Sequence, residues 1–169
     1  QTAALEIGYS SASFIAHQDC LIAVTGTGFT LKVNQRPMRI WTSVYVRKNW
    51  QIHLDQIGLP HDLLSKSGRG LTRRGLSGGN WATLAIHGGI QTPLVLGSRS
   101  TYLRASLGAD PARPLQTGDL LPIGPPSSSL LELASRTMPL MVNYSPNPEI
   151  HVIPGPQQSN FTASALSTF

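Results

Sequence analysis

The chain has 169 residues, the size of one ordinary domain, and a formal net charge of +5. Hydrophobic residues make up 40% of it, which excludes wholesale disorder, and its longest apolar runs are far shorter than the roughly 18 residues that cross a membrane. Its 16 glycines and 13 prolines leave little room for long helices. We therefore expect a turn-rich, mainly β domain that does not span a membrane.

The cysteine content and the start of the chain bear on its cellular context. Cys20 is the only cysteine, so neither an internal disulfide nor a cysteine-based metal site can form. No signal-peptide pattern opens the chain, and we expect a cytoplasmic protein. The chain begins at Gln1 and runs at once into an apolar stretch, which predicts a fragment of a longer polypeptide.

The first half of the chain is typical of short strands separated by turns. Runs of apolar or alternating residues predict strands at 21–24, 29–33, 38–41, 43–46, 50–54 and 81–86. We expect the second and third of these to form a hairpin across a turn at 34–35, and the fourth and fifth to pair across 47–49. This spacing favours an antiparallel barrel or sandwich.

The pattern is weaker in the second half, where prolines interrupt it. Strands are predicted at 139–144 and 149–153, and 130–134 fits either a helical turn or a loop. A short C-terminal helix is predicted at 162–167, with Thr162 as its N-cap.

A basic, glycine- and serine-rich segment spans about 56–80. Its cationic residues are Lys66, Arg69, Arg73 and Arg74. Such a cluster can contact phosphate groups, but no aromatic residues alternate with the charges as they do in nucleic-acid stacking surfaces. A mobile, solvated loop is therefore the favoured interpretation, and a nucleic-acid partner is disfavoured.

Short motifs for common chemistries fail on their context. Residues 75–79 fit the G-x-S-x-G pattern, but a basic loop precedes this serine and a strand follows it, whereas a nucleophile elbow needs a strand before the serine and a helix after it. No phosphate-binding loop is present. His53, Asp55 and His61 lack the spacing of a metal site, so no metal is predicted.

The segment 88–102 combines features of a ligand site. Gly88 and Gly89 follow the predicted strand 81–86 and would let a ligand approach the backbone closely. Arg99 offers a planar fork for carboxylate, phosphate or ureido oxygens, and hydroxyl groups flank it at Ser98, Ser100 and Thr101. This pattern indicates an anion or amide site. The alternative is a tight turn in which the arginine binds backbone carbonyls.

Three blocks of sequence, 84–90 (LAIHGGI), 95–105 (VLGSRSTYLRA) and 113–122 (RPLQTGDLLP), resemble a known family. It is the family of biotin-dependent carboxyltransferases and 5-oxoprolinase C subunits, also called allophanate hydrolase subunit 2, KipI antagonist or urea amidolyase-related protein. Residues 3–6 and 152–157 also resemble segments of this family, in the same order along the chain. The resemblance therefore spans essentially the whole chain. Family members are longer at both ends.

The resemblance implies a fold and an activity. The expected fold is a mainly β, cyclophilin-like barrel with a short C-terminal helix, in which 1–169 form a single partial domain. The implied activity is that of a component of an ATP-dependent 5-oxoprolinase, or of a carboxyltransferase moving a carboxyl group from biotin to urea or a similar amide. ATP and biotin would be cofactors of the complete complex, and the isolated fragment is expected to be inactive.

The resemblance also implies a partner and a site. The partner is a KipI-type protein, also called the B subunit or allophanate hydrolase subunit 1. The substrate-binding residues expected are Gly88, Gly89, Ser98, Arg99, Ser100, Thr101 and, as an amide partner, Gln157. A second hypothesis is a non-catalytic regulatory module that binds and antagonises a KipI-like kinase inhibitor.

Overall fold

The computed structural model describes residues 2–57, 79–109, 112–126, 129–139 and 149–168. Its strands are β1 (Leu5–Gly8), β2 (Ala12–Ile15), β3 (Cys20–Gly26), β4 (Phe29–Val33), β5 (Arg36–Met38), β6 (Ser43–Val46), β7 (Gln51–Gln56) and β8 (Trp81–Ile86). The helical elements are η1 (Leu103–Ala105), α2 (Leu130–Leu133), η2 (Gln158–Asn160) and α3 (Ala163–Thr168). No helix in these ranges combines the length and apolarity that a membrane crossing needs.

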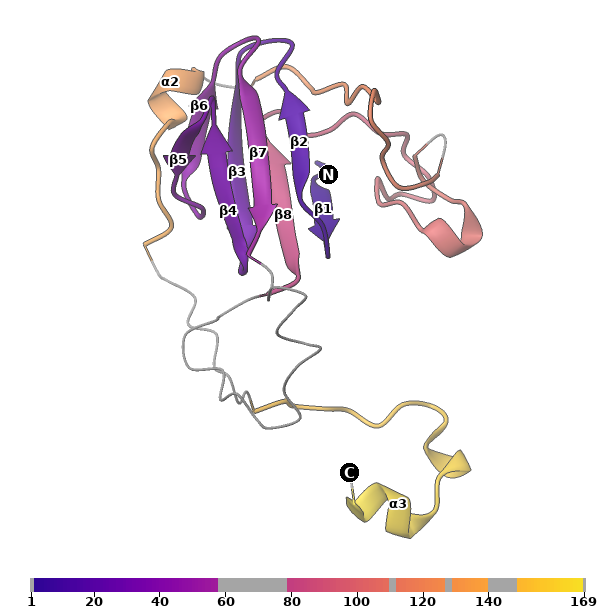
Figure 1. Cartoon of the computed structure of the whole chain (residues 1–169). Coiled ribbons are helices and arrows are strands. Elements are labelled where there is room, and N and C mark those ends of the chain that lie inside the picture. The colour runs from indigo at the N-terminus through magenta and orange to yellow at the C-terminus, as the bar shows by residue number, and fades with distance from the viewer. Residues whose placement is uncertain (1, 58–78, 110–111, 127–128, 140–148, 169) are drawn as a thin grey trace.

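The strands form two four-stranded antiparallel sheets, ordered β1-β8-β3-β6 and β2-β7-β4-β5. The sheets lie one behind the other (Figure 1). The mainly β prediction is confirmed. Among the described strands no pairing joins the two sheets, so they form two packed layers and no closed barrel is seen.

The core fills the space between the two sheets. Buried side chains come from both layers, including Val24 and Leu84 from the first sheet and Leu31 and Leu54 from the second. β4 shows the alternation that produces this arrangement, because Phe29, Leu31 and Val33 are buried while the residues between them are exposed. Each such side chain contributes about 1.5–3 kcal/mol by leaving water.

The predicted turn at 34–35 is confirmed. Asn34 and Gln35 have φ values of 49° and 68°, the left-handed pair that closes a two-residue hairpin. Val33 is paired with Arg36. The second strand of the hairpin, β5, therefore begins two residues earlier than 38 and ends at Met38.

The predicted hairpin between 43–46 and 50–54 is wrong. Both strands exist, but β6 pairs with β3 of the first sheet and β7 with β2 and β4 of the second. The carboxylate of Asp19 holds the connection, accepting hydrogen bonds from the Tyr45 hydroxyl at 2.5 Å and the Lys48 amide at 2.8 Å. The short link 47–50 thus passes from one layer to the other.

The other predictions of secondary structure have different outcomes in different parts of the chain. β1 and β2 were not anticipated, and the strand predicted at 149–153 is wrong, since those residues are exposed and irregular. The strand predicted at 139–144 and most of the basic segment 56–80 lie outside the described residues. The C-terminal helix is present as α3, where the Ala165 amide donates to the Thr162 hydroxyl at 3.2 Å, as expected for an N-cap.

Replacing Gly26 should destabilise the fold, because this residue combines a φ of +119° with close contact to β8. A Cβ at this position would lie 2.4 Å from the Trp81 carbonyl oxygen, and that atom belongs to backbone. Gly26→Ala should therefore cost about 3 kcal/mol of unfolding free energy, from the left-handed backbone and overpacking together.

The matched control is Gly118→Ala, which has a φ of +96° and nothing within 4 Å of the added carbon. It should cost about 1 kcal/mol. Urea denaturation measures both variants, and equal losses would contradict the close approach of β3 to β8.

Candidate functional site

Residues 90–109 and 112–125, which we call the strap, leave the first sheet after β8 and return to the same place. Ile90 forms bridges with both Ala3 and Ile123. The Gln91 amide donates to the Pro122 carbonyl at 2.8 Å, and the Gly124 amide to the Gly89 carbonyl at 2.9 Å. In Figure 1 the strap extends beside β1 and β8. Its two ends are thus held together at the base.

Gly88 and Gly89 form the base of the strap. Their φ values are +89° and +73°. A Cβ on Gly88 would lie 2.2 Å from the Gly124 carbonyl oxygen, and one on Gly89 would lie 2.9 Å from the Thr2 Cβ. The positive φ values favour glycine at both positions, and the close approach of backbone requires it at Gly88. That they also contact a ligand stays a prediction.

Arg99 follows a tight turn within the strap. Val95 and Ser98 exchange two backbone hydrogen bonds of 2.8 and 2.9 Å across Leu96 and Gly97, both with positive φ. The Arg99 guanidinium donates from Nη1 to the Thr92 carbonyl, and the Thr92 hydroxyl donates to the Arg99 carbonyl at 3.0 Å. The arginine is half-buried and binds one backbone carbonyl, as the tight-turn alternative proposed.

A cavity of about 380 Å³ lies between the strap and the first sheet. One wall is formed by Ser98, Arg99 and Ser100 of the strap. Thr83 of β8 and Glu6 of β1 line it from the sheet, and residues 2–4 complete it. The structure therefore brings three of the predicted site residues to one cavity and adds three polar residues, Thr2, Glu6 and Thr83, that the sequence pattern did not single out.

Glu6 and Thr83 reach this cavity through the register of β1 with β8. They are direct cross-strand partners, and so are their neighbours Ile7 and Ala82, which are buried in the core. Because side chains alternate along a strand, Glu6 and Thr83 lie on the opposite, outer face. Alternation along β1 could have predicted that Glu6 and Ile7 lie on opposite faces of the sheet. Only the pairing with β8 places Glu6 beside Thr83.

The other predicted residues lie elsewhere. The Thr101 hydroxyl accepts a hydrogen bond from the Ala109 amide at 3.3 Å and does not line the cavity. Gln157 is exposed and belongs to the segment 149–168, which is set apart from the sheets (Figure 1). The structure does not bring Gln157 to Arg99, and a contact between either residue and substrate stays a prediction.

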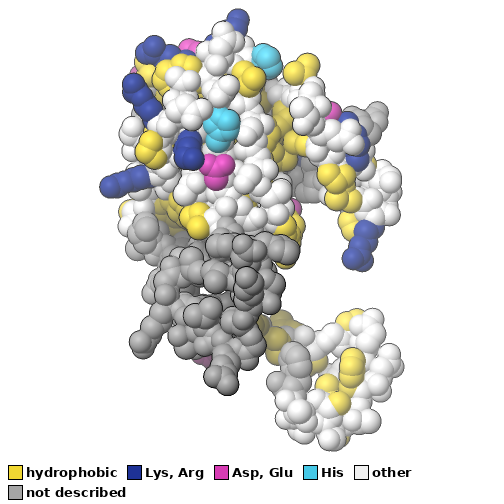
Figure 2. All heavy atoms as spheres, viewed as in Figure 1, with side chains coloured by type: hydrophobic (Ala, Val, Ile, Leu, Met, Phe, Trp, Pro, Cys, Tyr) yellow, Lys and Arg dark blue, Asp and Glu magenta, His cyan; other side chains and the backbone are white. Residues whose placement is uncertain are grey.

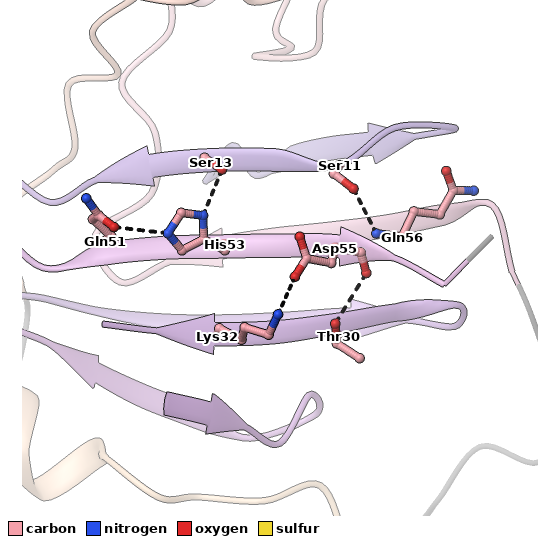
Figure 3. A network of polar contacts seen from close by, with 8 residues as sticks. All are labelled: Ser11, Ser13, Thr30, Lys32, Gln51, His53, Asp55 and Gln56. Carbon is pink, nitrogen blue, oxygen red and sulfur yellow. Dashed lines mark hydrogen bonds and ion pairs between the residues drawn. The ribbon is translucent and has the colours of Figure 1, made fainter. Parts of the chain in front are cut away.

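A polar network covers the outer face of the second sheet, where Figure 2 shows a histidine among cationic and acidic groups. His53 accepts or donates at both ring nitrogens, 2.9 Å from the Ser13 hydroxyl and 3.2 Å from Gln51, and Lys32 pairs with Asp55 at 2.9 Å (Figure 3). The serine–histidine contact joins cross-strand partners on an open sheet face. It is a contact between side chains of paired strands.

Metal and thiol chemistry find no support in the described ranges. No three potential metal ligands cluster there, and His61 lies outside them. Cys20 is buried in β3, and burial raises its pKa to about 11. The thiol is therefore protonated near neutral pH and is a poor nucleophile.

An ion pair between Arg113 and Asp119 holds part of the strap together, and it should make the stability of the protein depend on pH. Arg113 donates to both Asp119 oxygens, at 2.8 and 2.9 Å, and the Gln116 amide donates to the same carboxylate at 2.7 Å. These contacts lower the pKa of Asp119 from 3.8 to about 2, and the hydrogen bonds from the guanidinium make the largest contribution. Because the pKa of Asp119 is lower in the folded state than in the unfolded state, this stabilisation is present above pH 3.8. It is lost as the pH falls towards 2.

Asp119→Asn should therefore lower the melting temperature at neutral pH, and its difference from the parent should shrink as the pH falls through that window. Thermal unfolding followed by circular dichroism at several pH values measures this. Glu132→Gln, an exposed change on α2, is the control. A difference that is the same at every pH would contradict the role of this ion pair.

Comparisons with known proteins agree with this architecture. A family model described as the carboxyltransferase domain, subdomain A and B, matches residues 1–60 and 52–169. The C subunit of 5-oxoprolinase from Escherichia coli strain K12 is 28% identical over 166 residues, which are 98% of this chain and 46% of that protein. The urea amidolyase of Lachancea kluyveri is 29% identical over 136 residues, 80% of this chain and 6% of that protein. The chain thus spans less than half the length of these curated relatives.

Solved structures give the same result. The crystal structure of the Kluyveromyces lactis urea amidolyase superposes with a TM-score of 0.59 at 26% identity, over 80% of this chain and 7% of that one. A crystal structure of TTHA0988, at 24% identity, shares the fold with a TM-score of 0.68 over 98% of this chain and 28% of that one. The chain therefore belongs to the carboxyltransferase-domain family, subdomains A and B.

Proposed function

We propose that this chain is the amide-binding part of an ATP-dependent 5-oxoprolinase, acting with a KipI-type partner protein. The observation that carries the proposal is the cavity wall formed by Ser98, Arg99 and Ser100 under the strap. The similarity to a 5-oxoprolinase C subunit over nearly the whole chain supports it. Closure of the two sheets into a cyclophilin-like barrel is part of the same proposal.

The chemistry of this wall suits a small amide. When the amide carbonyl is attacked or activated, its oxygen gains negative charge. A guanidinium and two hydroxyl groups can stabilise that charge by hydrogen bonds that strengthen as it develops. Arg99, with Ser98 and Ser100 beside it, is thus assigned to binding and polarising the carbonyl.

A carboxyltransferase acting on urea or a similar amide is the second candidate, favoured by the similarity to urea amidolyases. Both reactions use an amide or ureido carbonyl, which the donors around Arg99 fit. ATP and, for carboxyl transfer, biotin would be bound by the complete complex, which we place in the cytoplasm.

The test is 5-oxoproline-dependent ATP hydrolysis by the complete natural protein, measured with and without its KipI-type partner. Hydrolysis that needs both proteins and the lactam supports the proposal. Hydrolysis driven by urea together with biotin carboxylation would favour the second candidate. Partner binding without any amide-dependent turnover would contradict both candidate activities and favour the non-catalytic regulatory module.

Arg99→Lys separates binding from structure. Lysine keeps a charged donor for the Thr92 carbonyl but cannot reproduce the planar fork. In the complete complex, kcat/KM for the amide should fall about ten- to a hundredfold, the loss expected for one charged hydrogen bond. The melting temperature should change little.

Arg104→Lys is the matched control, because Arg104 is an exposed arginine of the same strap that does not line the cavity. It should leave both quantities unchanged. A strongly destabilised Arg99→Lys protein, whose activity falls only in step with its folded fraction, would assign Arg99 to holding the strap alone.

A further inference from the structure

The cavity has polar groups of opposite character on its two sides. Arg99 on the strap presents a guanidinium, which only donates hydrogen bonds, and Glu6 on β1 presents a carboxylate, which only accepts them when ionised. In the described part of the chain no ion pair joins the two side chains, since neither takes part in the salt bridges found there. Glu6 is exposed to the cavity side of the sheet.

The remaining polar groups of the cavity are less selective. Thr2, Thr83, Ser98 and Ser100 carry hydroxyl groups, which can donate or accept. They adapt to either kind of ligand atom. Among the side chains on the sheet side of the cavity, discrimination between a ligand N–H and a ligand oxygen therefore rests on the carboxylate.

The register of the sheet fixes the face on which this carboxylate lies. Glu6 is paired with Thr83, and its neighbour Ile7 is buried with 5% of its surface exposed. A slip of one residue would move Ile7 out of the core, so the register is strongly specified. The acceptor therefore lies on a rigid strand, while the donor lies on the strap.

We propose that Glu6 is a substrate-binding residue that accepts the N–H of an amide whose carbonyl is bound by Arg99. This inference rests on the proposed function and names the ligand class more narrowly: an amide or ureido group that retains an N–H, such as a lactam. Two anchors of opposite character also fix the direction in which such a ligand enters the cavity.

The proposal predicts discrimination between a lactam and its lactone. In the lactone a ring oxygen replaces the N–H, so a lone pair would face the carboxylate of Glu6 and no hydrogen bond could form. A site built to bind one polar group rejects the analogue lacking it more strongly than a hydrophobic pocket rejects a missing methylene. The lactone carbonyl has the same place in the ring but is a weaker acceptor than the lactam carbonyl, so the contribution of Glu6 is the change in preference between the parent and a variant at Glu6.

The experiment measures the affinity of the complete protein, with its partner, for 5-oxoproline and for the lactone of the same skeleton, 5-oxotetrahydrofuran-2-carboxylate. Isothermal titration calorimetry gives both dissociation constants without turnover. The parent protein should prefer the lactam by about tenfold or more, as expected for one charged hydrogen bond.

Glu6→Ala should reduce this preference by about tenfold, mainly by weakening lactam binding. Glu6→Gln, which keeps a neutral acceptor, should retain part of the preference. Glu132→Ala, the same change on the exposed face of α2, should behave as the parent. Equal melting temperatures of the two alanine variants establish that Glu6→Ala is folded.

The outcomes separate the two proposals. A lactam preference as large in Glu6→Ala as in the parent would overturn the role of Glu6. So would a folded parent that binds lactam and lactone equally. Either result leaves the proposed amide chemistry standing. A complete complex that binds neither compound would overturn both. Loss of the preference in Glu6→Ala alone, with lactone affinity unchanged, supports the proposal.

Discussion

The antiparallel pairing of β1 with β8 is the constraint on which the rest of the structure depends. It joins residues near the start of the chain to residues more than 70 positions later, with Leu5 opposite Leu84 and Gly8 opposite Trp81. Such long-range pairing has a loop-closure cost that only burial and the ladder of hydrogen bonds can offset. Ile7, Ala82 and Leu84 supply the buried side chains on one face. The same pairing leaves Glu6 and Thr83 on the other face, where the cavity forms.

The strap depends on this pairing and on glycine at its base. Gly88 and Gly124 approach so closely that a side chain on either would overlap the carbonyl oxygen of the other, at 2.2 and 2.3 Å. Ile90 then joins the strap to Ala3, just before β1. Strand, glycine base and strap thus form one continuous arrangement. It brings Arg99, from the second half of the chain, and Glu6, near its beginning, to the same cavity.

Arg99 illustrates how a binding group and a structural group can be one residue. Its guanidinium has five N–H donors in a fixed plane. One nitrogen binds the Thr92 carbonyl and thereby orients the side chain within the strap. A side chain oriented in this way loses less conformational entropy when it binds a ligand. The two interpretations of the arginine offered by the sequence are therefore compatible in physical terms.

By itself the sequence determined the class of the fold and much of its local structure. Apolar alternation placed β4, β6 and β8, the turn at Asn34–Gln35 followed from local backbone preference, and the block around Arg99 carried both the ligand chemistry and the family resemblance. These features depend on neighbouring residues. Only the tertiary structure decided that β6 and β7 belong to different sheets, that Gln157 lies apart from Arg99, and that Glu6 lies beside Thr83. The sheet membership of β6 and β7 and the place of Glu6 depend on which distant strands pair, and pairing is settled by the burial of whole faces, a quantity that no local pattern contains. The position of Gln157 depends on the path of a segment without strands, which no local pattern contains either.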